Sequence, residues 1–138
     1  MKKYFLLSGL LLLLCACSTK KQLVCQDAFY SDLSYTFVGE KPIEKVYLDN
    51  ILNYSGLSEA QFEDQKESLQ STYEGAYPDS EITLKYNDGS VSVHVELSKE
   101  MSAQLLQEIT HKPLNLESIA LSDIQAATDG TNIYCKSK

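Results

Sequence analysis

The chain has 138 residues and a formal net charge of −7, with 12 lysines, no arginine and 19 acidic residues. This balance excludes a basic groove for nucleic acid, and the lack of arginine excludes bidentate clamps on phosphate or carboxylate groups. The length corresponds to one ordinary domain.

Residues 1–16 have the pattern of a bacterial lipoprotein signal peptide. Two lysines give a positive start, an apolar run covers residues 5–14, and Leu14-Cys15-Ala16-Cys17 has the form of a lipobox. The run is shorter than the roughly 20 apolar residues that a membrane-spanning helix needs. We therefore expect cleavage before Cys17 and a diacylglyceryl group on its sulfur, because two acyl chains make a stable anchor.

A lipid on Cys17 predicts a location on the extracytoplasmic face of the cell membrane. Ser18 is not a retention signal of the aspartate type, so sorting to an outer membrane is permitted if the cell has one. Residues 17–22 are expected to form a short tether that keeps the domain close to the membrane, because an extended chain spans at most about 3.5 Å per residue. This favours an envelope or membrane protein as the partner, and Lys20 and Lys21 weakly favour anionic headgroups.

Two cysteines remain for the folded domain, because Cys15 leaves with the signal peptide and Cys17 carries the lipid. An even pair in an exported domain is typical of a disulfide, so we expect a bond between Cys25 and Cys135. A redox or metal-binding pair is disfavoured, since the sequence has no Cys-x-x-Cys spacing.

Residues 23–138 are expected to form a single α+β domain, with an antiparallel β-sheet and two to three helices packed mainly on one face. Residues 23–29 predict a short strand, and residues 33–37 alternate apolar and polar side chains with period two. Residues 39–42 break this strand, and residues 46–52 predict the next. A turn centred on Glu40-Lys41 would pair Tyr35 with Val46 and Leu33 with Leu48.

A capping box predicts the first helix, because Gln61 follows Ser58 by three residues. The side chains expected on its buried face are Phe62, Leu69 and Tyr73. Asp88-Gly89 then predicts a hairpin with a two-residue turn. The apolar pairs expected across it are Tyr86 with Val91, Leu84 with Val93 and Ile82 with Val95.

Two further helices and a last strand complete the domain. Ser98 is expected to cap a helix whose inner face carries Met101, Leu105, Leu106 and Ile109. Ser122 is expected to cap a short third helix, and residues 133–135 predict a strand that returns Cys135 to Cys25.

No catalytic, cofactor-binding or metal-binding residue can be assigned, so we expect no enzyme. His94 lies on the polar side of its strand without a visible nucleophile or second ligand, which predicts a surface or edge histidine. His111 is expected to end a helix. The acidic residues Glu59, Glu63, Asp64 and Glu67 lack the loop that a calcium site uses and predict a solvated helix face. Glu81 and Glu96 face each other, but on a sheet surface rather than in a cleft.

Tyrosine is abundant, with nine in the chain and no tryptophan. The predicted core does not require Tyr30, Tyr47, Tyr54, Tyr77 or Tyr134. Tyrosine suits binding surfaces and is also a common strand residue, and the structural interpretation is favoured. The first hypothesis is a membrane-anchored interaction module. The alternative is a small-ligand or metal-binding lipoprotein that uses the tyrosines and helix acids.

The chain resembles the YehR-like family of small bacterial lipoproteins of unknown function. The resemblance rests on Ser34-Tyr35-Thr36-Phe37-Val38-Gly39-Glu40-Lys41, the Ser58 helix, the hairpin of residues 82–97 and the Met101 helix, and it covers most of the chain after the signal. Tyr134-Cys135-Lys136 with Cys25 resembles members that carry a cysteine pair, whereas Pro42 departs from the pattern. The resemblance implies no catalytic residue.

Overall fold

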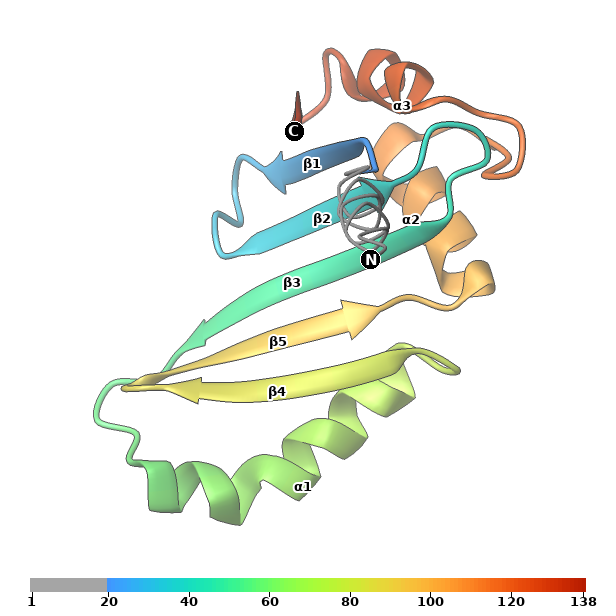
Figure 1. Ribbon diagram of the computed structural model, residues 1–138. Helices are drawn as coiled ribbons and strands as arrows, with labels where there is room; N and C mark the ends of the chain where they lie inside the picture. Colours follow the sequence, from blue (N-terminus) through green and yellow to red (C-terminus); the bar gives the residue numbers. More distant parts are fainter. Residues whose placement is uncertain (1–19) are drawn as a thin grey trace, which may run out of the picture.

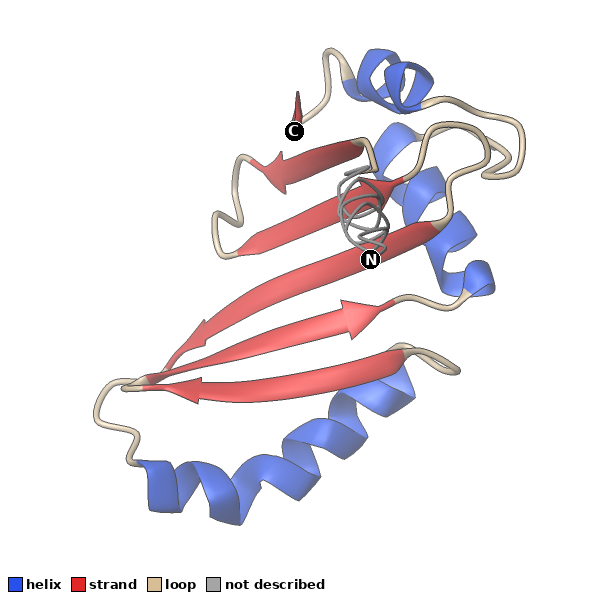
Figure 2. Cartoon of the chain, in the orientation of Figure 1, coloured by secondary structure: helices blue, strands red, loops and turns tan. Residues whose placement is uncertain are grey.

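The computed structural model describes residues 20–138, so the predicted signal peptide and the predicted lipidation site Cys17 lie outside the described part (Figure 1). The elements in chain order are β1 (Gln22–Asp27), β2 (Leu33–Val38), β3 (Lys45–Asn53), α1 (Glu59–Ala76), β4 (Glu81–Asn87), β5 (Ser90–Glu96), α2 (Lys99–Thr110), α3 (Leu121–Thr128) and β6 (Ile133–Ser137). The strands form one six-stranded sheet in the order β4-β5-β3-β2-β1-β6, with every neighbouring pair antiparallel. The expected α+β fold, with helices packed on an antiparallel sheet, is confirmed (Figure 2). No helix within residues 20–138 is long and apolar enough to cross a membrane.

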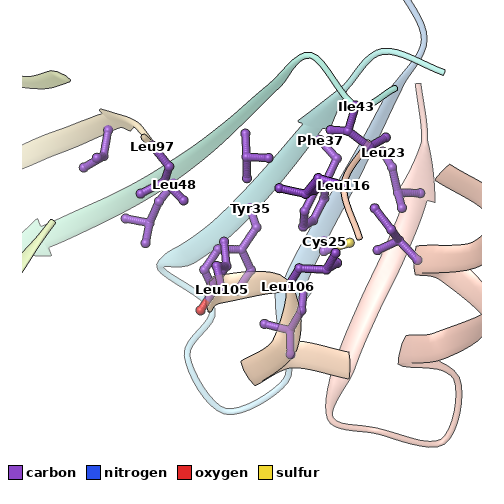
Figure 3. Close-up of a cluster of buried hydrophobic side chains, with 14 of the residues drawn as sticks. Leu23, Cys25, Tyr35, Phe37, Ile43, Leu48, Leu97, Leu105, Leu106 and Leu116 are labelled. Atoms are coloured by element: carbon purple, nitrogen blue, oxygen red, sulfur yellow. The ribbon is translucent and has the colours of Figure 1, made fainter. Parts of the chain in front are cut away.

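One face of the sheet carries the hydrophobic core, because side chains alternate between the two faces of each strand. The buried strand residues on this face include Leu23, Cys25, Tyr35, Phe37, Val46, Leu48, Val91, Val93 and Val95. The helices contribute Phe62, Leu105, Leu106 and Ile124, and Figure 3 shows Leu105 and Leu106 among the strand residues of this cluster. Full burial of one such side chain contributes about 1.5–3 kcal/mol.

The hairpin of β4 and β5 has the register that the sequence predicts. Tyr86 pairs with Val91, Leu84 with Val93 and Ile82 with Val95. Asp88 and Gly89 both have positive φ, at 34° and 86°, which is the backbone that a type I′ turn requires.

The predicted register of β2 with β3 is wrong by two residues. Tyr35 pairs with Leu48, and Phe37 pairs with Val46. The turn centres one residue later than expected because Ile43 buries its side chain in the core, and its N–H donates to the carbonyl of Leu116 at 3.2 Å. β3 begins at Lys45, one residue before the expected Val46.

Gly39 is required in this connection. Its φ is +115°, and an added Cβ would lie 3.0 Å from the carbonyl oxygen of Pro42 and 3.0 Å from the backbone nitrogen of Glu44. A side chain at this position would meet backbone atoms in a conformation that favours glycine.

The first two helices begin as predicted, and the third begins earlier. Gln61 N–H donates to Ser58 Oγ at 3.2 Å, and Ser58 N–H donates to Gln61 Oε1 at 2.9 Å, which completes the capping box of α1. Ser98 Oγ caps α2. The expected cap at Ser122 is wrong. The N-cap is Ala120, whose N–H donates to the Asp123 carboxylate at 2.8 Å, so α3 begins at Leu121.

The disulfide joins the first and last strands. Cys25 and Cys135 are direct cross-strand partners and are bonded, which confirms the expected pairing. Lys138 N–H donates to Gln22 O and Ala28 N–H donates to Asn132 O, so the cysteines occupy a non-hydrogen-bonded position. Opposite side chains lie closest at such positions, which suits the bond.

Candidate binding surface

The face of the sheet opposite the helices carries a histidine–carboxylate pair. His94 Nδ1 lies 2.5 Å from Asp49 Oδ1, and the Tyr47 ring stacks on the imidazole with centroids 5.0 Å apart. The sequence predicted a surface or edge histidine and did not indicate this carboxylate partner. Asp49 lies directly opposite His94, but β3 and β5 are separated in the sequence by α1 and β4, so no local pattern reveals the pair.

This pair suits recognition better than catalysis. An imidazole held by a carboxylate can act as a base, but the two side chains keep 48% and 43% of their surface exposed on an open sheet. Such a surface does not exclude water from a reaction. β5 lies inside the sheet, so His94 is a surface histidine and not an edge histidine.

The two glutamates of the β4–β5 hairpin do not form a catalytic dyad. Glu81 faces Glu96 as the sequence predicts. However, Lys45 Nζ lies 2.8 Å from Glu96 Oε1, and the hydrogen bond and charge of Glu96 raise the pKa of Lys45. Glu96 thus has a lysine as its ion-pair partner, which is the arrangement of an ordinary surface ion pair.

Three tyrosines lie on the helix side of the sheet and have structural roles. Tyr35 is buried, and this burial, with smaller effects from nearby charged or ionisable groups, raises its pKa to about 12. The Tyr73 hydroxyl accepts a hydrogen bond from Asn50 Nδ2 at 3.1 Å. Tyr77, which the predicted core does not require, packs against the core beside Tyr73, and burial raises its pKa.

Five large apolar side chains within residues 20–138 are exposed, by 40–74%: Phe29, Tyr30, Ile51, Tyr54 and Tyr134. All five lie toward one end of the sheet, where β1, β3 and β4 end and β2, β5 and β6 begin (Figure 1). We call this group the apolar tip. The opposite end holds residue 20, where the described chain starts, and Lys138.

The backbone of the apolar tip is fixed by hydrogen bonds between its loops. Phe29 N–H donates to Asp27 Oδ1 at 2.7 Å, which ends β1 two residues before the expected Phe29. Ile51 N–H donates to Asp32 O at 2.9 Å, and Tyr54 N–H donates to Gly89 O at 3.0 Å. These bonds hold the exposed side chains on an ordered scaffold, which lowers the entropy lost on binding.

The sequence indicated only part of the apolar tip. Tyr30, Tyr54 and Tyr134 stand out because the predicted core does not require them. Phe29 was expected inside a strand, and Ile51 has the residue type of a core position. The turn-forming residues around Phe29-Tyr30, Asp27 before it and Ser31-Asp32 after it, are the signal that could have indicated an exposed loop.

A cavity of about 490 Å³ lies at the other end of the sheet. Its apolar lining includes Ile43, Leu97 and Leu116. Lys99 and Glu117 also line it and pair with each other, and this contact lowers the pKa of Glu117. The volume falls in the range of small-ligand sites.

The remaining candidate residues do not assemble into a site. Glu59, Glu63, Asp64 and Glu67 are exposed on α1. His111 is the C-cap of α2, with φ of 55° and its N–H donating to Gln107 O. Within residues 20–138, no group of three or more potential metal ligands is present.

Comparison of the chain with protein-family models, curated proteins and solved structures found no match. Functional inference therefore depends on the residues and geometry described above.

Proposed function

We propose that this protein is a lipid-anchored extracytoplasmic interaction module that binds an envelope or membrane protein through its apolar tip. The observation that carries the proposal is the gathering of the five exposed apolar side chains at one end of the sheet. Single exposed apolar residues are ordinary, whereas a group of them indicates an interaction surface. Aromatic residues, which form most of the tip, are enriched in protein interfaces.

The expected anchor gives this surface a direction. A lipid on Cys17 would hold the end of the sheet near Gln22 against the membrane. β1 has six residues and a rise of about 3.3 Å per residue, so the apolar tip would stand about 20 Å farther out. We further propose that the chain belongs to the YehR-like family of small bacterial lipoproteins, because it carries the motifs described above.

The anchor is tested by Cys17→Ser, with Cys15→Ser as the matched control. We expect Cys17→Ser to abolish lipid labelling and membrane fractionation, and Cys15→Ser to leave both intact. Unchanged processing and membrane association of Cys17→Ser would refute the anchor.

The interaction surface is tested by photo-crosslinking in intact cells, with a photoreactive amino acid replacing Tyr30 or, as the control, Glu67 on α1. We expect a crosslinked species of defined mass from position 30, absent from position 67. Equal labelling at the two positions, or none at position 30, would contradict a role for the apolar tip.

The cavity beside Ile43 supports a second candidate function, the binding of a small ligand. A ligand at 100 times its dissociation constant would stabilise the fold by about 2.7 kcal/mol. Thermal-shift screening against metabolites and metals tests this candidate, with Leu116→Trp, which would fill the cavity, as the control. A shift retained in Leu116→Trp would place the ligand elsewhere.

A further inference from the structure

We infer that the apolar tip binds a lysine- or arginine-rich segment of a partner protein. This inference rests on the proposed function and adds the chemistry of the partner. Its basis is the combination of exposed aromatic rings with a surplus of negative charge at the same end of the sheet.

The negative charge comes from residues in the loops that carry the tip. Asp27 and Asp32 flank the Phe29-Tyr30 loop, Asp88 lies in the β4–β5 turn, and Glu59 begins α1 directly after the Tyr54 loop. Asp32, Asp88 and Glu59 are exposed. A surface with this sign of charge attracts a basic partner and repels an acidic one.

Several lysines at the other end of the sheet are paired with glutamates. Lys21 contacts Glu40, Lys45 contacts Glu96, and Lys99 contacts Glu117. These ion pairs neutralise part of the charge at that end. By contrast, within residues 20–138 none of the four tip carboxylates, Asp27, Asp32, Glu59 and Asp88, forms an ion pair, so the tip keeps its negative charge.

Aromatic rings next to carboxylates are suited to lysine and arginine side chains. A cation above the face of a tyrosine or phenylalanine ring is attracted by the ring, while its methylene stem packs on apolar surface. The adjacent carboxylate then takes the hydrogen bonds of the charged group. A purely apolar partner would leave these carboxylates without partners at the edge of the contact.

The tip also has a defined length. Tyr134 on β6 and Ile51 on β3 are separated by three strand spacings, through β1 and β2. Each spacing is about 4.8 Å, so the side chains span roughly 14 Å across the sheet. An extended segment covers this distance with about four to five residues.

The test uses the full-length chain in a non-ionic detergent and two fluorescent peptides of equal length. One peptide contains four tandem copies of Lys-Leu-Gly, and the other contains four copies of Glu-Leu-Gly. Fluorescence anisotropy is expected to show at least about tenfold tighter binding of the basic peptide, with an affinity that falls as salt rises. Equal binding of the two peptides, or tighter binding of the acidic one, would overturn the inference.

Two sets of variants assign this binding to the tip. Phe29→Ser with Tyr30→Ser is expected to weaken binding of the basic peptide about tenfold, because each exposed cation–π contact accounts for a factor of about two to five. Tyr134→Ser, on a different strand, is expected to weaken it by about two- to fivefold. Unchanged thermal unfolding midpoints confirm that these variants fold. Binding that is unaffected in both would overturn the inference.

The charge contribution is tested with Asp27→Asn and Asp32→Asn, where asparagine at position 27 keeps the oxygen that accepts from Phe29 N–H. The matched control is Glu40→Gln with Glu117→Gln, which changes the net charge equally at the other end. We expect the first pair to weaken binding at least fivefold more than the control. An equal effect would show that net charge alone drives binding and would overturn the inference. If the inference is overturned in this way but position 30 still crosslinks in cells, the proposed function stands without a basic partner. If position 30 does not crosslink either, the proposed function and the inference both fail.

Discussion

Removing the Cys25–Cys135 disulfide is expected to lower the free energy of unfolding by about 4–5 kcal/mol. The two cysteines are 110 residues apart, so the bond closes nearly the whole domain into one loop. For a loop of this length, the chain-entropy relation predicts that the bond lowers the entropy of the unfolded chain by about 16 cal/mol/K. This corresponds to a stabilisation of about 4.8 kcal/mol at 25 °C. This is a large share of the about 5–15 kcal/mol that stabilises a typical domain.

The assay is equilibrium urea unfolding, followed by circular dichroism, of the oxidised and the reduced protein. Reduction keeps both sulfur atoms, so it leaves the volume of the buried Cys25 side chain nearly unchanged. The entropy of unfolding is about 2.1 cal/mol/K per residue, or roughly 250 cal/mol/K for residues 20–138. Losing about 4–5 kcal/mol of unfolding free energy therefore corresponds to a fall in Tm of about 15–20 °C. The double variant Cys25→Ala with Cys135→Ala is the control, because its midpoint should not respond to reductant.

Oxidised and reduced protein with urea midpoints that agree within error would refute this reasoning. The unfolded chain would then already be compact enough that the bond removes little freedom. A lower urea midpoint in the alanine variant alone would indicate a packing defect at position 25 and not an effect of loop closure.

Three further outcomes are expected. Ser58→Ala should lower the free energy of unfolding by about 1 kcal/mol, because the capping box of α1 loses its side-chain acceptor, and an unchanged urea midpoint would contradict this. Tyr35 has a pKa raised from 10.0 to about 12, so its neutral form is favoured in the folded state. The contribution of neutral Tyr35 to the free energy of unfolding is complete below pH 10 and is lost as the pH rises toward 12. Urea unfolding should therefore show a steeper loss of stability in this window for wild type than for Tyr35→Phe. A double-mutant cycle of Asp49→Ala and His94→Ala should give a coupling energy of only about 0.2–1 kcal/mol, because the pair is solvent-exposed, and a coupling above about 2 kcal/mol would show that the pair is not a simple surface contact.

The features that sequence predicted correctly depend on residues close together in the chain. The Asp88-Gly89 turn determines the register of β4 with β5, because a two-residue loop leaves only one way to align the alternating side chains. Ser58 and Gln61 are three residues apart, so their reciprocal hydrogen bonds follow from helix geometry.

The features that sequence did not predict depend on distant contacts. The register of β2 with β3 follows from the burial of Ile43, and this burial involves Leu116, more than 70 residues later. The partnership of Asp49 with His94 exists only because β5 pairs with β3 across an intervening helix and strand. The apolar tip gathers residues from two strands and two loops, and its members have no common spacing in the sequence.

The pairing of β1 with β6 also has a consequence for the order in which the protein is made. β1 lies between β2 and β6 in the sheet, so one side of it has no partner until the last strand exists. Synthesis of the 110 residues from Cys25 to Cys135 takes about 5–20 s at ordinary rates of translation. Throughout that interval the chain lacks a complete sheet, and this delay would suit the export across a membrane that we propose for this polypeptide.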